Sequence, residues 1–234
     1  MFKKILSTAL AMAMVLSMAV STSAALGKPG SSTPSTKTEQ SSSSSKKSSS
    51  SSKEYDLCKT QLAKDKLALS MHNTFLSGLK ANKDKITVSI KGYTEKQVYA
   101  AFQSSLQMIF DEHPEIFWLD TMQNLVVSSD HKTLTFYPRP ASGYGTASKD
   151  GLTASKLNTT AIKNTTAKMN EAVKKMTGST TYEQVKAIHD GIINKTQYPA
   201  NPDKATHNQH QAVGPLVEGK AVCDGYAKAF KYAC

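Results

Sequence analysis

Residues 216–234 read LVEGKAVCDGYAKAFKYAC, and this is the informative stretch of the chain. Gly219 ends the preceding segment, and Cys223 follows a short connector. Apolar residues then recur at the spacing of a helix, at Ala227, Phe230 and Ala233. The pattern predicts a helix that has Cys223 in its first turn and one apolar face buried.

A cysteine in the first turn of a helix lies where a negative charge is stabilised. The free N–H groups and the helix dipole favour the thiolate, and the same N–H groups can bind an oxyanion. A carboxylate at Asp224 would oppose ionisation of the thiol if it pointed at Cys223, so we expect it to point elsewhere and to cap the helix. We interpret Gly225 as a residue that keeps the approach of a substrate open. By position alone, a small buried cysteine is the competing interpretation.

The run GKAVCDGYAKAF, residues 219–230, resembles the nucleophile motif of the transglutaminase-like superfamily, especially of its bacterial secreted members. Residues 182–198, YEQVKAIHDGIINKTQY, are similar to the helix that precedes this motif. Residues 111–120, DEHPEIFWLD, are similar to a segment often found N-terminal to it. The resemblance implies an α+β fold, with the first half of a transglutaminase-like, papain-like core in residues 151–234 and a mixed helix and strand lobe in residues 55–150.

The resemblance also implies a chemistry for the motif. Cys223 would be the catalytic nucleophile, supported by the motif residues Gly219, Asp224, Gly225 and Tyr226. The thiolate would attack an amide carbonyl of a peptide or protein, and an amine or water would resolve the thioester. A histidine would serve as acid and base and an aspartate would orient it. No cofactor is predicted.

In this superfamily the histidine and aspartate follow the cysteine. We therefore expect the sequence to be truncated after the nucleophile motif and the full-length protein to supply both residues. The alternative is a catalytically inactive binding or scaffold module at the cell surface, in which Cys223 is an inert buried thiol. Hydrolysis, deamidation and crosslinking to an amine stay open as outcomes of the reaction.

The N-terminus has the three parts of a secretory signal peptide, predicted over residues 1–25. Lys3 and Lys4 precede an apolar run, and small residues follow it. The run is short for a bilayer span, so we expect secretion and no membrane span after cleavage. Residues 26–54 are rich in serine and poor in apolar residues, which predicts a disordered tether.

The formal net charge of the chain is +11. Seven lysines and two glutamates lie in residues 1–54, which leaves +6 for the rest. The remaining lysines are dispersed, and Arg139 is the only arginine. This pattern argues against nucleic-acid binding and is compatible with attraction to anionic cell-wall polymers.

The three cysteines, Cys58, Cys223 and Cys234, suggest one free thiol in an exported protein. Along one helix Cys223 and Cys234 would lie roughly 16 Å apart, too far for a disulfide. Pairing of Cys58 with Cys234 stays open, and a buried thiol is the alternative for Cys234.

The histidines offer weaker signals. His207 and His210, taken with the two cysteines near the end of the chain, have poor spacing for zinc, so no metal site is predicted. His189, followed by Asp190, lies at the edge of an apolar helix face, where we expect a structural packing role.

The rest of the chain mixes helix and strand patterns without a βαβ rhythm, which predicts an α+β fold. Helices are predicted over 58–79, from Thr94 to Pro114, over 157–176 and after 181, and strands over 86–90, 124–128 and 134–137. Capping boxes are predicted at Thr94 with Gln97 and at Thr181 with Gln184. The helix after the second box is expected to bury Val185, Ile188, Ile192 and Ile193. Trp118 is interpreted as a core residue.

Overall fold

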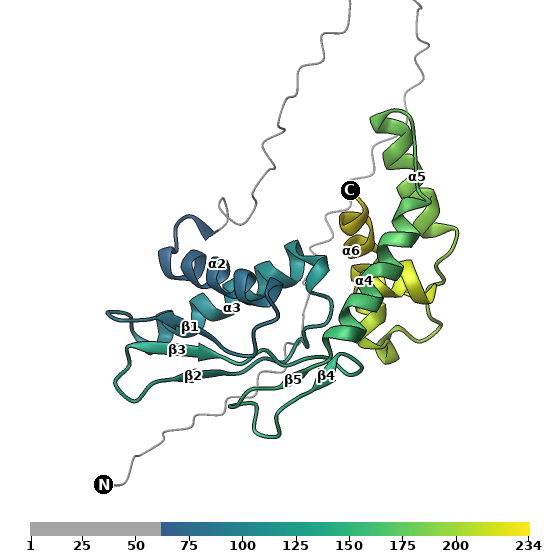
Figure 1. Ribbon diagram of the computed structural model, residues 1–234. Helices are drawn as coiled ribbons and strands as arrows, with labels where there is room; N and C mark the ends of the chain where they lie inside the picture. The colour runs from purple at the N-terminus through teal and green to yellow at the C-terminus, as the bar shows by residue number, and fades with distance from the viewer. Residues whose placement is uncertain (1–61) are drawn as a thin grey trace, which may run out of the picture. The chain divides into compact units, whose positions relative to one another are not determined.

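A three-stranded antiparallel sheet and two helices form the first part of the fold (Figure 1). The computed structural model describes residues 62–234. The strands are β1 (Ile86–Ser89), β2 (Leu125–Val127) and β3 (Thr133–Phe136), in the order β1-β3-β2. Phe136 lies opposite Ile86 on one side and Leu125 on the other, so β3 is central. All three strands were predicted: β1 and β3 show an alternating pattern, and β2 is a short apolar run next to a polar turn.

One face of this sheet is buried against helices α2 (Lys66–Lys80) and α3 (Glu95–Glu112). Phe75 of α2 lies between Phe102 of α3 and Phe136 of β3, with ring centroids 5.8 Å and 4.9 Å away. The outer residues of β1 alternate with buried ones and are exposed. The aromatic contacts therefore join both helices to the central strand.

Helix α3 begins and ends where the sequence predicts. The Thr94 hydroxyl accepts a hydrogen bond of 3.4 Å from the N–H of Gln97, and the Gln97 side chain accepts one of 2.9 Å from the N–H of Thr94. Pro114 starts the 3-10 turn η1 (Pro114–Ile116) just after the helix. Trp118 follows this turn and is 2% exposed, which confirms its interpretation as a core residue.

Two short strands, β4 (Gly145–Thr146) and β5 (Lys156–Leu157), pair in antiparallel register. Neither strand was predicted, and β4 lies in the region from Pro138 to Gly151 that was expected to be a loop. Helix α4 (Thr159–Lys174) follows directly, with the Asn158 side chain accepting from the N–H of Ala161 at 3.0 Å.

The predicted start of helix α5 (Thr181–Ile193) was wrong by one residue. The capping box is formed by Thr180 and Glu183, because Thr180 is the residue with the extended backbone that an N-cap requires. The side chain of Gln184 instead donates to the carbonyl of Met176 at 2.8 Å.

The buried face of α5 is also narrower than predicted. Ile188 and Ile192 are buried, but Val185 and Ile193 are 43% and 46% exposed. The last helix is α6 (Cys223–Ala233), which buries Gly225 and Ala229, whereas Ala227 of the predicted stripe is exposed.

The α+β class is confirmed for residues 62–234. The buried apolar residues form one cluster that draws on both the 55–150 and the 151–234 regions. The predicted signal peptide at 1–25, the tether at 26–54 and Cys58 lie outside the described residues. No helix in residues 62–234 is both long and apolar enough to span a bilayer.

Removing the ring of Phe75 tests the aromatic cluster. Phe75 is fully buried, so Phe75→Ala should lower the free energy of unfolding by about 3–5 kcal/mol through lost burial and the cavity left behind. Tyr182 is 75% exposed, and Tyr182→Ala should change this free energy by no more than about 0.5 kcal/mol. Urea unfolding of both variants gives the comparison, and equal losses would contradict the described core.

Candidate active site

The start of α6 is held by the backbone of an upstream loop. This loop contains the 3-10 helix η3 (His207–His210) and the π-helical turn η4 (Gly214–Glu218). The carbonyl of Gln209 accepts a hydrogen bond of 3.1 Å from the N–H of Val222, the N-cap residue of α6. The loop thus fixes where the first turn of α6 begins.

Cys223 is the first residue of α6, as predicted, and it is exposed. No side chain caps this end of the helix. Within residues 62–234, the N–H groups of Cys223 and Asp224 form no hydrogen bond to another residue. An exposed thiol at a helix start is accessible to a substrate, and the unpaired N–H groups beside it can bind an oxyanion. The interpretation of Cys223 as a buried thiol was wrong.

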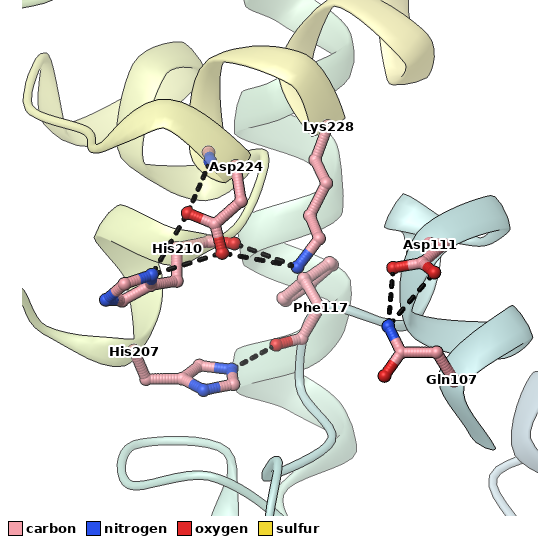
Figure 2. A network of polar contacts seen from close by, with 8 residues as sticks. Gln107, Asp111, Phe117, His207, His210, Asp224 and Lys228 are labelled. Atoms are coloured by element: carbon pink, nitrogen blue, oxygen red, sulfur yellow. Dashed lines mark hydrogen bonds and ion pairs between the residues drawn. The ribbon is translucent and has the colours of Figure 1, made fainter. Parts of the chain in front are cut away.

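Asp224 is held between His210 and Lys228, as Figure 2 shows. Its two oxygens lie 3.0 Å and 3.1 Å from Nδ1 of His210. One oxygen also accepts a hydrogen bond of 3.0 Å from the N–H of Gly225, and the other lies 4.0 Å from Nζ of Lys228. Asp224 is the second residue of α6, so it does not take the N-cap position that was predicted for it.

Gly225 permits close contact between α6 and the loop. It is buried, and a Cβ atom there would lie 2.2 Å from the carbonyl oxygen of Gln209. The space left by its missing side chain is therefore filled by backbone. The prediction that Gly225 keeps a substrate path open was wrong, because its role is packing.

The other motif residues, Gly219 and Tyr226, hold the segment around Cys223 in place through hydrogen bonds. Gly219 ends η4 with φ +70°, a left-handed conformation that favours glycine. Its carbonyl accepts a hydrogen bond of 2.9 Å from the N–H of Gln197. The hydroxyl of Tyr226 donates to the carbonyl of Thr196 at 2.8 Å. Both residues thus tie the site to the segment that follows α5.

His207 links the loop to the core. Its Nε2 donates to the carbonyl of Phe117 at 2.7 Å, which requires the tautomer with a proton on Nε2. Burial lowers the pKa of His207, and the hydrogen bond to Phe117 only partly offsets this effect. The histidine is therefore held as a neutral donor and takes a structural role.

Two further sequence interpretations fail. His189 is exposed and its Nδ1 lies 3.0 Å from a carboxylate oxygen of Asp190, so it has no packing role. Cys234 is exposed as well. Among the residues that the structure describes, no group of three or more His, Cys, Asp or Glu side chains could hold a metal ion.

The partners of Asp224 were not predicted from the sequence. Lys228 lies four residues after Asp224 on the same helix, and side chains at this spacing are neighbours. The contact between Asp224 and Lys228 was therefore predictable from the sequence. His210 lies on a different element, fourteen residues upstream, and nothing in the local pattern indicates its contact with Asp224.

Neither the models of known protein families nor the curated proteins give a match to this chain. The motif around Cys223 and the geometry of α6 are therefore the features that bear on function.

A methyl group at position 225 should disrupt the site. Gly225→Ala should lower the free energy of unfolding by about 1–3 kcal/mol, because the new Cβ would meet the backbone of Gln209. Gly191, inside α5, is the matched control: a Cβ there would lie 2.8 Å from the side chain of Met176, and the three nearest atoms all belong to that side chain and not to backbone. Thermal unfolding should show a clearly smaller loss for Gly191→Ala, and a larger loss there would contradict the described packing.

The buried state of His207 predicts a pH dependence of stability. The unfolded chain binds a proton near the ordinary value of about 6.5, whereas the folded chain resists it, so stability should fall as the pH drops through that value. His207→Gln keeps an N–H donor but cannot titrate. Urea unfolding at about pH 7.5 and about pH 5.5 should show a smaller acid loss in this variant than in the wild type.

Proposed function

We propose that the protein is a secreted cysteine-dependent acyl-transfer enzyme of the transglutaminase-like superfamily, with Cys223 as nucleophile and peptide or protein amides as substrates. The observation that carries this proposal is the exposed Cys223 thiol at the unpaired N-terminus of α6. The proposal includes a papain-like core, of which α6 would be the central helix. Export is inferred from the signal-peptide pattern in residues 1–25.

The geometry at α6 supports the first half of such a reaction. The Cys223 thiolate attacks the carbonyl carbon of an amide, and the carbonyl oxygen becomes an oxyanion beside the free N–H groups of Cys223 and Asp224. The carbon–nitrogen bond then breaks, and the nitrogen leaves as an amine or as ammonia after it takes up a proton. The product on the enzyme is a thioester at Cys223.

The second half regenerates the thiol. Water or an amine attacks the thioester carbonyl and gives an acid or a new amide, and the sulfur leaves and regains a proton. The resemblance implies that a histidine and an aspartate after Cys223 move these protons. In the sequence above, all six histidines precede Cys223.

A catalytically inactive binding module is the second candidate function. It is favoured by one observation: in residues 62–234, no hydrogen bond joins the Cys223 side chain to a histidine. His210, on the loop beside α6, is occupied through Nδ1 by Asp224. A thiol without an acid–base partner would not complete the cycle described above.

Turnover by cysteine variants separates the two candidates. In protein purified from its native source, incorporation of a fluorescent primary amine into casein and release of ammonia should both be lost in Cys223→Ala. The matched control is Cys234→Ala, which removes the exposed cysteine at the other end of α6 and should keep full activity. Far-UV circular dichroism should be the same for both variants. Turnover that survives Cys223→Ala would refute the enzyme proposal, and a folded wild type without turnover favours the binding module.

A further inference from the structure

A negative charge beside the nucleophile is the unusual feature of this site. Asp224 follows Cys223 directly at the start of α6. An unpaired carboxylate at this position opposes the formation of a thiolate, because like charges at short range repel.

Both oxygens of Asp224 are engaged (Figure 2). His210 Nδ1 lies 3.0 Å and 3.1 Å from them, and the N–H of Gly225 donates to one at 3.0 Å. Nζ of Lys228 lies 4.0 Å from the other. The carboxylate thus has a cation one helical turn away and a ring N–H on the facing loop.

The side chain of Lys228 is largely buried beside Asp224. Its side chain is 14% exposed, and its Nζ donates to the carbonyl of His210 at 3.0 Å. Burial lowers the pKa of Lys228, and the charges of Asp224 and Asp111 oppose this shift. An ammonium group taken out of water needs an anionic partner, and the Asp224 carboxylate supplies one at 4.0 Å from its Nζ.

Other charged groups around this network have their own partners. Lys231 of α6 is paired with Glu112 of α3. His207 donates to the carbonyl of Phe117. Glu218 of η4 accepts from the side chain of Asn208.

We propose that Lys228 and His210 are positioning residues for Cys223: they hold the Asp224 carboxylate in an ion-paired network, so that its charge does not oppose thiolate formation. This inference rests on the proposed function for its biological meaning. Its physical content, the coupling of Lys228 to the Cys223 thiol through Asp224, is measurable without turnover.

The reactivity of a single thiol tests the coupling. Cys58→Ser and Cys234→Ser leave Cys223 as the only thiol in the 234-residue chain. The rate of alkylation by iodoacetamide is measured against pH, and the midpoint of the profile reports thiolate formation. Lys228→Met should move the midpoint up by at least about half a pH unit, which slows alkylation near neutral pH about threefold.

A double-mutant cycle shows whether the effect passes through Asp224. Asp224→Asn alone should move the midpoint little, because its charge is already compensated. Asp224→Asn combined with Lys228→Met should return the midpoint to its original value. Lys231→Met, which removes a cation from the same helix, is the control for net charge and should give a clearly smaller shift.

Two outcomes would overturn the inference: no shift with Lys228→Met, or the same shift with and without Asp224. If Lys228→Met does not fold, His210→Ala tests the same network. The His210 side chain is 43% exposed, and its removal should shift the midpoint of the alkylation profile in the same direction. Alkylation needs no substrate, so this test remains valid even if the turnover assay fails. If the enzyme is active but the coupling is absent, this inference is refuted and the proposed function is not.

Discussion

The contact between the carbonyl of Gln209 and the first turn of α6 is the constraint on which the site depends. The N–H of Val222 reaches this oxygen at 3.1 Å, and Gly225 leaves no side chain between the two backbones. A hydrogen bond and a missing Cβ together set the position of the helix start. The position of this helix start determines the surroundings of Cys223.

The same contact explains why a charged residue is tolerated beside the thiol. Because the loop lies against α6, His210 is carried to within 3.0 Å of Asp224, and Lys228 reaches back to the carbonyl of His210. The polar groups thus satisfy one another across two elements. Within residues 62–234, the N–H groups of Cys223 and Asp224 at the helix start are left without a hydrogen-bond partner.

Local signals in the sequence were sufficient for much of the fold. The Thr94 and Gln97 box, the alternating strands and the helix that opens at Cys223 all depend on residues within one element, and each is present. The second capping box was predicted one residue too late. Thr180 and Thr181 are both suitable N-cap residues, and the extended backbone that makes Thr180 the N-cap cannot be read from the sequence.

The site was predicted less well because its contacts join distant residues. The role of Gly225 depends on a backbone oxygen sixteen positions earlier, and the partner of Asp224 belongs to another element. Exposure of Val185 on α5 likewise depends on what packs against the helix, and not on its apolar pattern. Periodicity identifies an apolar face but does not identify its neighbours.

The hydrogen bond from His207 to Phe117 joins residues 90 positions apart, and it ties the loop beside Cys223 to the first half of the chain. The sheet and helices α2 and α3 are made first during synthesis, and their aromatic contacts do not involve the loop or α6. The buried cluster nevertheless draws on residues from both halves of the chain. The surroundings of Cys223 therefore depend on the same long-range contacts that complete the core.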